Sequence, residues 1–202
     1  MSSKSQKKQQ IRNEIRRSRQ QLSEEECLAA GYDVSLNLQK YFPMRRAVNV
    51  ACYLASDGEV SLTPVIELLW KRKKKVCLPV LFKLSPRAMY FAGYDKQTIM
   101  LDNLYGIPEP ATKAHHKVMP FALDIVLMPL VAFDRSGNRL GMGGGFYDRY
   151  FSFINRQTSI CKPKLIGVAH DFQEVTSLES EPWDVPLDAI VTETRLIRFT
   201  RR

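Results

Sequence analysis

The chain has 202 residues, of which 45% are hydrophobic, and a formal net charge of +9. This composition suffices for one buried core, so we expect a single domain over residues 1–202. No apolar run approaches the roughly 18 residues of a membrane helix, and the polar start lacks the apolar segment of a secretory signal. We therefore expect a cytoplasmic protein without a membrane partner, whose four scattered cysteines are buried thiols and not a metal cluster.

Most of the positive charge lies in two short segments. Residues 1–20 carry seven basic side chains against one acidic side chain, and residues 71–75 are all basic. The remainder of the chain is close to neutral. Such a distribution admits nucleic-acid binding, and it equally admits a basic arm folded over a small polyanion.

The N-terminal part is predicted to form two helices. After a flexible start at residues 1–6, residues 7–22 show the spacing of a basic helix. Ser23 followed three residues later by Glu26 is a capping box and predicts the start of a second helix, which ends at Pro43. The core-facing side of this second helix is expected to consist of Leu28, Val34, Leu38 and Tyr41.

An apolar strand predicted at residues 47–54 ends in a turn that carries acidic residues. The turn reads Ser56-Asp57-Gly58-Glu59. Ligands of open α/β sheets collect at the carboxyl ends of the strands, so Glu59 is a candidate ligand contact. The alternative is an ordinary solvent-facing turn glutamate.

A third helix is predicted from Thr63 to Trp70, with Pro64 at its start. The basic run at residues 71–75 follows its last turn. Cations there are favourable at the negative end of the helix dipole, so the run needs no nucleic acid to explain it.

The rest of the chain alternates strands with a further helix. Residues 106–110 contain two prolines and are predicted to lie outside any central strand. His115 and His116 lack a third ligand at metal-binding spacing and are expected in a polar loop. The alternation predicts a three-layer α/β/α fold with a mostly parallel sheet. The expected strands are at residues 76–81, 89–94, 124–130, 164–170, 183–191 and 196–199, with an aromatic-faced helix at 146–154.

The stretch from Asn138 to Arg149 carries the strongest chemical signal. Four glycines lie within five residues, and their N–H groups can converge on an anion. The flanking Arg139 and Arg149 could neutralise phosphate charge, and Asp148 beside them suggests a bridging cation. A Walker A loop would need Lys-Ser/Thr after the glycines, and a dinucleotide fingerprint needs a small residue at Phe146, so neither template fits. A purely structural turn remains the alternative.

Residues 139–149 read Arg-Leu-Gly-Met-Gly-Gly-Gly-Phe-Tyr-Asp-Arg and resemble the signature of the 5-formyltetrahydrofolate cyclo-ligases, also called 5,10-methenyltetrahydrofolate synthetases, in their bacterial form. The resemblance runs from about Lys8 to Glu193. It implies the topology shared by phosphosugar isomerases and CoA transferases. The implied reaction closes 5-formyltetrahydrofolate, including polyglutamated forms, to 5,10-methenyltetrahydrofolate with MgATP. Phosphorylation of the formyl oxygen and attack by N10 of the folate would release ADP and phosphate.

The resemblance also implies a set of site residues. Arg139 and Arg149 would act as catalytic cations, and Asp148 and Asp188 would associate with Mg²⁺. The implied ATP contacts are Lys8, Arg12, Arg139, Leu140, Gly141, Met142, Gly143, Gly144, Gly145, Phe146 and Tyr147. The implied folate contacts are Leu54, Glu59, Met142, Gly143, Gly144, Gly145 and Phe146. Two of these positions depart from some relatives, because Gly144 replaces a lysine and Phe146 replaces a tyrosine.

Two other functions stay open at this point. A basic nucleic-acid-binding module would want aromatic residues interleaved with the basic ones, which residues 1–20 lack. A phosphosugar isomerase-like enzyme on the same fold would need a general base, for which the sequence offers no evident candidate. We expect a monomer that binds the folate and MgATP, and no nucleic acid.

Overall fold

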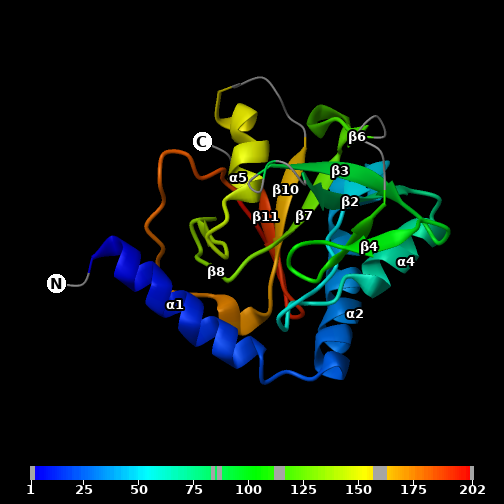
Figure 1. Cartoon of the computed structure of the whole chain (residues 1–202). Helices are drawn as coiled ribbons and strands as arrows, with labels where there is room; N and C mark the ends of the chain where they lie inside the picture. Colours follow the sequence, from blue (N-terminus) through cyan, green and yellow to red (C-terminus); the bar gives the residue numbers. More distant parts are fainter. Residues whose placement is uncertain (1–2, 83–84, 86–87, 112–116, 157–162, 201–202) are drawn as a thin grey trace.

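A computed structural model describes the whole chain except residues 1–2, 83–84, 86–87, 112–116, 157–162 and 201–202. An eight-stranded sheet runs through the molecule in the order β12-β11-β10-β7-β1-β2-β3-β6 (Figure 1). The five inner strands from β11 to β2 are parallel, whereas β12 and β3 are antiparallel to their inner neighbours. The strands are β1 (Asn49–Ala51), β2 (Lys75–Leu81), β3 (Met89–Tyr94), β6 (Lys117–Val118), β7 (Ile125–Pro129), β10 (Lys164–Val168), β11 (Ala189–Val191) and β12 (Leu196–Arg198).

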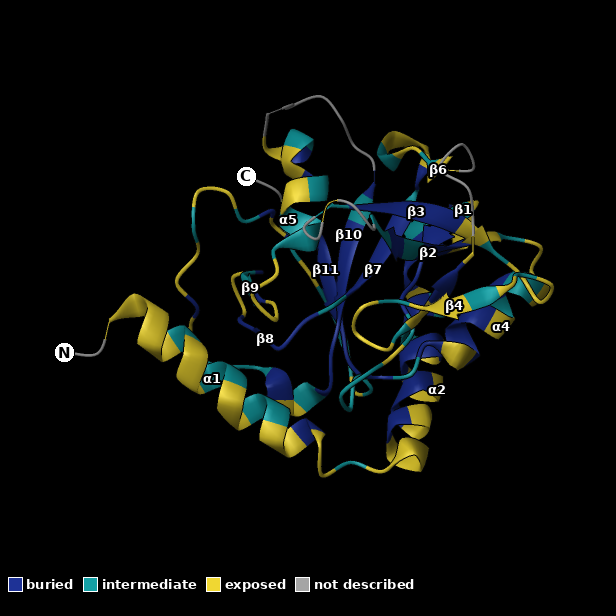
Figure 2. Ribbon diagram, viewed as in Figure 1, coloured by how far each residue is buried: buried dark blue, intermediate teal, exposed yellow. Residues whose placement is uncertain are grey.

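The predicted three-layer, mostly parallel α/β fold is confirmed. β7, β10 and β11 are apolar on both sides and almost fully buried, as is typical of parallel strands covered on both faces (Figure 2). One core packs the sheet against α2 (Glu24–Lys40) and α4 (Thr63–Lys71). The other core packs it against α5 (Phe146–Tyr150) and the 3₁₀ helix η3 (Ser152–Arg156). None of the described helices is long and apolar enough to cross a membrane.

Capping boxes start both N-terminal helices. α1 (Lys4–Arg19) begins after Ser3, whose hydroxyl accepts a hydrogen bond from the Gln6 N–H. The helix therefore starts three residues earlier than predicted, because the Ser3–Gln6 capping box went unrecognised. The capping box predicted at Ser23 is present, with the Glu26 N–H donating to its hydroxyl at 3.2 Å.

The buried side of α2 differs from the predicted one at its start. Leu28 is 37% exposed, because the helix buries Cys27 and not Leu28 at this turn. The chain then forms a short extra helix, α3 (Phe42–Arg46), where the prediction had only an end.

Two small hairpins lie outside the main sheet. β4 (Met100–Asp102) pairs with β5 (Pro108–Pro110), so the proline-rich segment lies outside the central sheet as predicted. β8 (Ala132–Phe133) pairs with β9 (Arg139–Leu140) directly before the glycine-rich stretch. Short 3₁₀ helices lie at η2 (Pro120–Ala122) and η4 (Asp171–Gln173).

Two cysteines lie in the middle of the sheet. The Cys52 N–H donates to the Cys77 carbonyl at 2.8 Å, and both side chains are buried. Burial raises the pKa of the Cys77 thiol to about 11 and that of Cys52 further still. The predicted polar loop at His115 and His116, and Cys161, lie outside the described residues.

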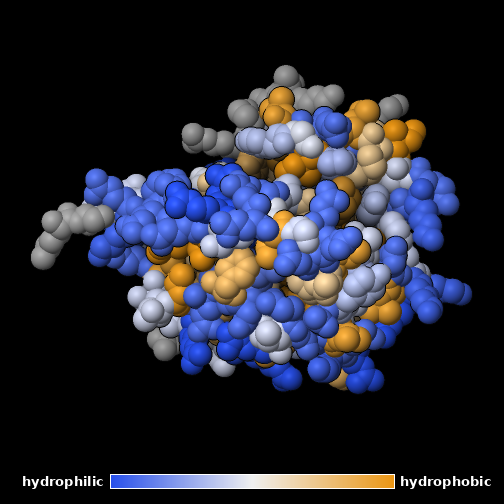
Figure 3. All heavy atoms as spheres, turned by 90° about the horizontal axis from the view of Figure 1, so that it is seen from below, coloured by the Kyte–Doolittle hydropathy of each residue, from blue (hydrophilic) through white to orange (hydrophobic). Residues whose placement is uncertain are grey.

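α1 lies along the lower side of the molecule, separate from α2, α4 and α5, which pack on the sheet (Figure 1). Ile11 and Ile15 pack against Ala132, Leu140 and Leu178, and most of its other side chains reach solvent. Seen from below, hydrophilic side chains dominate the part of the surface next to the N-terminus (Figure 3).

Candidate active site

A cleft with two connected parts runs between α1, the glycine-rich stretch and the carboxyl end of the sheet. The first part, which we term the basic compartment, has a volume of about 920 Å³ and is lined by Lys4, Lys8, Arg12, Arg139, Gly143 and Arg149, among others. The second part, the apolar compartment, has a volume of about 770 Å³ and is lined by Tyr53, Leu54, Glu59, Leu81, Met142 and Phe146, among others. Four residues line both compartments: Arg139, Gly141, Gly145 and Asp148.

A buried carboxylate fixes the hairpin that delivers the glycine-rich stretch. Asp134 is 2% exposed and accepts hydrogen bonds from the N–H groups of Ser136 at 2.9 Å and Asn138 at 3.0 Å. It also accepts from the Leu178 N–H at 2.8 Å. The hairpin is thus anchored to the C-terminal part of the chain, and β9 leads directly into the cleft.

The glycines make the turn that follows. Gly143 has φ = 101° and Gly145 has φ = 60°, in the region that favours glycine. Gly145 is the N-cap of α5, so the chain passes from strand to helix within a few residues. Because of this tight turn, residues of the same stretch line both compartments: Gly143 lines the basic one, and Met142 and Gly144 line the apolar one.

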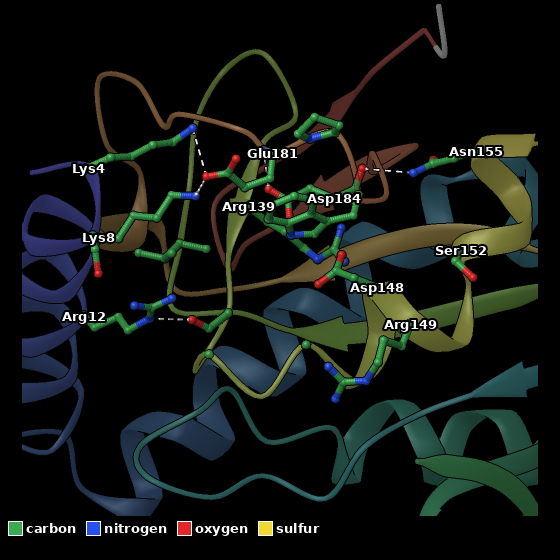
Figure 4. A pocket seen from close by; sticks show the side chains of 17 residues that line it. Lys4, Lys8, Arg12, Arg139, Asp148, Arg149, Ser152, Asn155, Glu181 and Asp184 are labelled. Carbon is green, nitrogen blue, oxygen red and sulfur yellow. Dashed lines mark hydrogen bonds and ion pairs between the residues drawn. The ribbon is translucent and has the colours of Figure 1, made fainter. Parts of the chain in front are cut away.

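Cations from one face of α1 line the basic compartment. Lys4, Lys8 and Arg12 are spaced four residues apart and line this cavity. The two lysines point toward Glu181, whereas Arg12 points toward the glycine-rich stretch (Figure 4). The Arg12 Nε donates to the Gly141 carbonyl at 2.9 Å, and burial lowers the pKa of its guanidinium. Lys4 and Lys8 place their Nζ atoms 2.8 and 3.3 Å from the Glu181 carboxylate.

Two arginines flank the glycines as predicted. Arg139 is nearly buried, and it donates to Asp148 and to the Val185 carbonyl. Burial lowers the pKa of its guanidinium, and the nearby Asp148 opposes that effect. Arg149 donates to the Gly144 carbonyl, with its guanidinium carbon 5.6 Å from the centroid of the Phe146 ring.

The structure separates the two carboxylates that were expected to share a metal. Asp148 lines both compartments, and its two hydrogen bonds, from Arg139 and from the Val185 N–H, both use Oδ1. Asp188 is 4% exposed and lines neither compartment. Its oxygens accept from Lys164 Nζ at 2.9 Å and from the Leu165 N–H at 2.8 Å.

Asp184 lies where Asp188 was expected. It lines the basic compartment close to Asp148, and both carboxylates act electrostatically on Arg139 (Figure 4). The predicted strand at 183–191 begins only at Ala189, so Asp184 belongs to a loop that reaches the cleft. Two carboxylates suit a hard divalent cation that keeps most of its water ligands. No group of three or more potential metal-ligating side chains occurs among the residues that the structure describes.

Glu59 is one of three carboxylates that line the apolar compartment, with Asp57 and Asp148. Its side chain is 12% exposed, and its Oε2 accepts from the Ser56 N–H at 3.1 Å. Burial raises the pKa of Glu59 to about 7, although the nearby Arg19 opposes the shift. The surrounding wall is largely apolar, so a ligand here would be largely apolar with a few hydrogen-bond donors.

The predicted contacts divide between the two compartments. Those of the predicted ATP contacts that line the basic compartment are Lys8, Arg12, Arg139, Leu140, Gly141, Gly143 and Gly145. The other four, Met142, Gly144, Phe146 and Tyr147, line the apolar compartment. The predicted folate contacts all line the apolar compartment except Gly143.

Several lining residues had no place in the prediction. Lys4 lies one helical turn before Lys8, and that spacing is the signal that could have revealed it. Glu181, Trp183 and Asp184 come from a loop far away in the sequence. Arg19 belongs to the basic segment at residues 1–20, where the sequence does not distinguish it from the solvent-exposed cations, yet its side chain is 1% exposed.

Comparisons with known proteins point to one family. A family model described as the 5-formyltetrahydrofolate cyclo-ligase family matches residues 4–193. The chain is 42% identical to a 5-formyltetrahydrofolate cyclo-ligase of Haemophilus influenzae, over 90% of this chain and 95% of that protein. It is 40% identical to that of Escherichia coli K12, over 90% and 98% of the two chains. A solved 5,10-methenyltetrahydrofolate synthetase of Aquifex aeolicus superposes with a TM-score of 0.78 at 31% identity, covering 96% of this chain and 94% of that one.

Proposed function

The chain belongs to the 5-formyltetrahydrofolate cyclo-ligase family, and we propose that its two-compartment cleft is where 5-formyltetrahydrofolate and ATP react. The enzyme is an ATP-dependent ligase that forms 5,10-methenyltetrahydrofolate. Family membership favours this function over the nucleic-acid-binding module and the isomerase-like enzyme. Mg²⁺ dependence, a cytoplasmic location, a monomeric state and use of polyglutamated folate remain predictions.

In this reaction the protein has to position the two substrates and neutralise the charge of the transferred phosphate. The formyl oxygen attacks the γ-phosphorus of ATP, and ADP leaves. N10 of the folate then attacks the activated formyl carbon, and loss of phosphate completes the ring. Both nucleophiles belong to the substrate, so the protein needs to hold two ligands in line and stabilise the charge that develops between them.

The wall shared by the two compartments is the observation that carries the proposal. Phosphoryl transfer requires the γ-phosphate and the formyl oxygen to meet. Arg139, Gly141, Gly145 and Asp148 line both cavities, so groups bound in either one can meet at this wall. Arg139 is the cation of this set, and it is nearly buried, where a fixed charge acts most strongly.

ATP fits the basic compartment. A triphosphate needs several cations, and Lys4, Lys8, Arg12 and Arg149 reach this cavity from two elements. The two lysines already hold a carboxylate, that of Glu181, which shows that they can converge on one anion. Forked guanidinium groups suit phosphate oxygens in addition.

The folate fits the apolar compartment. Its pterin ring is flat and carries N–H donors, which the Glu59 carboxylate could accept at one end of the cavity. Leu54, Met142 and Phe146 supply apolar contact area around it. The formyl group would then lie toward the shared wall.

Mg²⁺ would be held between Asp148 and Asp184, with the polyphosphate as its other partner. When bound, the ion neutralises phosphate charge during transfer. We do not assign Asp188 to this role, because its oxygens accept hydrogen bonds from Lys164 and Leu165 away from the cavity.

A spectroscopic assay tests the proposal. Purified protein with 5-formyltetrahydrofolate and MgATP should develop the absorbance of methenyltetrahydrofolate, and omission of ATP should abolish it. Glu59→Gln should weaken folate binding about tenfold or more and leave ATP binding within about twofold, since the two ligands occupy different compartments. An absorbance rise without ATP would refute the proposed function, and equal losses for both ligands would refute the placement of Glu59.

A further inference from the structure

A buried arginine lies beneath the apolar compartment. Arg19 is the last residue of α1, and its side chain is 1% exposed at the base of that cavity. Burial of a guanidinium is unfavourable unless partners of opposite charge compensate. Its Nη2 lies 2.8 Å from Asp57 Oδ2 and its Nη1 lies 3.8 Å from Glu59 Oε1. Nη1 also donates to the Leu130 carbonyl at 3.3 Å, whereas Nε is buried without a hydrogen-bond partner.

The first carboxylate is fully engaged within the protein. Asp57 accepts from Arg16 Nε at 2.8 Å and from Gln20 Nε2 at 2.6 Å, in addition to Arg19. Desolvation alone would raise the pKa of Asp57, but these hydrogen bonds outweigh it and lower the pKa to about 2. Asp57 therefore serves to hold the end of α1 against the turn, although its side chain also lines the apolar compartment.

The turn before Glu59 is fitted closely to Arg19. Asp57 has φ = 50° and Gly58 has φ = 70°. A Cβ added at Gly58 would collide with the carbonyl oxygen of Arg19, so glycine is required there on two grounds. The Gly58 carbonyl lies 3.1 Å from the His170 Nε2 on the other side. The backbone and the side chain of Arg19 together fix where this turn lies.

The second carboxylate is left able to bind something else. The 3.8 Å between Arg19 Nη1 and Glu59 Oε1 is too long for a hydrogen bond. The positive charge of Arg19 therefore acts on Oε1 electrostatically, while Oε1 can still accept a hydrogen bond from a ligand. We propose that Arg19 is a positioning residue for folate recognition, which fixes the Asp57–Gly58 turn and favours the charged form of the Glu59 carboxyl, an acceptor that faces the apolar compartment. This role rests on the proposed function, because it presumes that folate fills that compartment.

The surroundings of Glu59 predict how the role can be measured. The titratable and charged groups around its carboxyl are Arg19 from α1, Asp57 from its own turn, Tyr53 after β1 and Tyr147 from α5. Arg16, Arg139 and Asp148 line the same cavity farther along. Burial raises the pKa of Glu59, Arg19 lowers it and Asp57 raises it. Loss of Arg19 should therefore raise the pKa of Glu59, and loss of the Asp57 charge should lower it.

The test is the dissociation constant of 5-formyltetrahydrofolate measured by calorimetry between pH 5.5 and 8.5, with the ATP constant measured in parallel. Wild-type folate binding should weaken as the pH falls through about 7, because protonated Glu59 loses its charge. In Arg19→Gln this midpoint should rise by about one pH unit and folate affinity at pH 7 should fall about tenfold or more, with ATP affinity within about twofold.

Two further variants serve as controls. Arg19→Lys keeps the charge and should retain most of the wild-type midpoint. Arg17→Gln removes an exposed cation from the same helix and should change neither constant.

Asp57→Asn provides the opposite shift and keeps Arg19. Asparagine tolerates the left-handed backbone of this position, so the turn should survive. The released guanidinium should act more strongly on Glu59, and the midpoint should move below the wild-type value. This variant decides the matter if circular dichroism shows that Arg19→Gln does not fold.

The outcomes separate the two levels of the proposal. Failure of the wild-type protein to bind 5-formyltetrahydrofolate would count against the proposed function itself. Normal wild-type binding with an unshifted midpoint in folded Arg19→Gln, or in Asp57→Asn, would overturn the role of Arg19. Equal losses of folate and ATP affinity in Arg19→Gln would indicate a merely structural residue and would overturn it as well.

Discussion

Arg139 is the residue on which both halves of the cleft depend. It is nearly buried, it lines both compartments, and its partners are the Asp148 carboxylate and the Val185 carbonyl. A cation at this wall can act on charge that develops during phosphoryl transfer, which is when a fixed charge in a dry site contributes most.

Arg139→Ala should lower kcat about 100- to 1,000-fold, the usual effect of removing one fixed transition-state donor. It should also lower the thermal midpoint, because Asp148 loses the partner of a partly buried ion pair. Steady-state kinetics and a thermal melt of the same preparation measure the two effects. A kcat within tenfold of the wild-type value in the folded variant would contradict the assignment.

Glu59, the proposed folate contact, is unfavourable for folding at neutral pH. Its pKa is about 7 in the folded protein against an ordinary value of 4.5, mainly because of burial. Below pH 4.5 the carboxyl is protonated in both states, so folding is not penalised. Between pH 4.5 and 7 the unfolded chain ionises while Glu59 in the folded protein stays largely protonated, so up to about 3 kcal/mol of unfolding free energy is lost over this range and no more is lost above it.

Glu59→Gln should therefore be more stable than the wild-type protein at pH 8, by about 2–3 kcal/mol, and equal to it near pH 4.5. Urea unfolding at several pH values measures the difference. Glu193→Gln, a partly exposed carboxylate bonded to the Asp171 N–H, serves as the comparison. A constant difference at every pH would contradict the assigned pKa of Glu59.

At the scale of elements, the loop at residues 179–184 and helix α1 face each other across the basic compartment. Glu181 holds the Nζ atoms of Lys4 and Lys8, and it is partly exposed (Figure 4). A polyphosphate that binds these lysines has to replace this carboxylate. Ion pairs of this exposure contribute little, so the replacement should be easy.

Glu181→Gln should tighten ATP binding, by about two- to fivefold at low ionic strength, since it removes the internal competitor. The dissociation constant of ATP at two salt concentrations measures this, and the gain should shrink at high salt. Glu179→Gln is the control, because its carboxylate lies 3.7 Å from Lys4 alone. Weaker ATP binding in Glu181→Gln would show that Glu181 supports the nucleotide and does not compete with it.

The elements were predictable from local patterns, whereas the site was predictable only in part. Apolar runs and the Ser23 capping box are local signals, and the central sheet and α2 follow from them. Lys8, Arg12 and Arg139 were assignable because their motifs are contiguous. Asp184 was not, because an expected strand at 183–191 placed the wrong aspartate at the cleft. Arg19 was missed because sequence reports its charge and not the two carboxylates that allow its burial.

At the scale of the whole molecule, one helix lines both compartments. α1 places Lys4, Lys8 and Arg12 in the basic compartment and Arg16 and Arg19 in the apolar compartment. Its apolar packing is limited to Ile11 and Ile15 against a small cluster. A ligand that orders either half of the helix thereby prepares the other half.

Binding of the two ligands should therefore be cooperative. A non-hydrolysable ATP analogue should tighten 5-formyltetrahydrofolate binding about fivefold, and the folate should tighten binding of the analogue by the same factor. Calorimetric titrations in both orders measure the two factors. Arg12→Gln should weaken the analogue and leave folate binding without nucleotide unchanged. Independent binding of the two ligands would contradict the role of α1.

The thiols of Cys52 and Cys77 are protected from alkylation in the folded molecule. Cys77 lies on β2 and Cys52 directly follows the neighbouring β1; both are buried, and their raised pKa values keep them protonated at neutral pH. Iodoacetamide can reach them only when the sheet opens. The rate at which these two sites become labelled thus reports how often the core opens. Saturation with ATP and folate should slow labelling about tenfold for every 1.4 kcal/mol of stability that the ligands add.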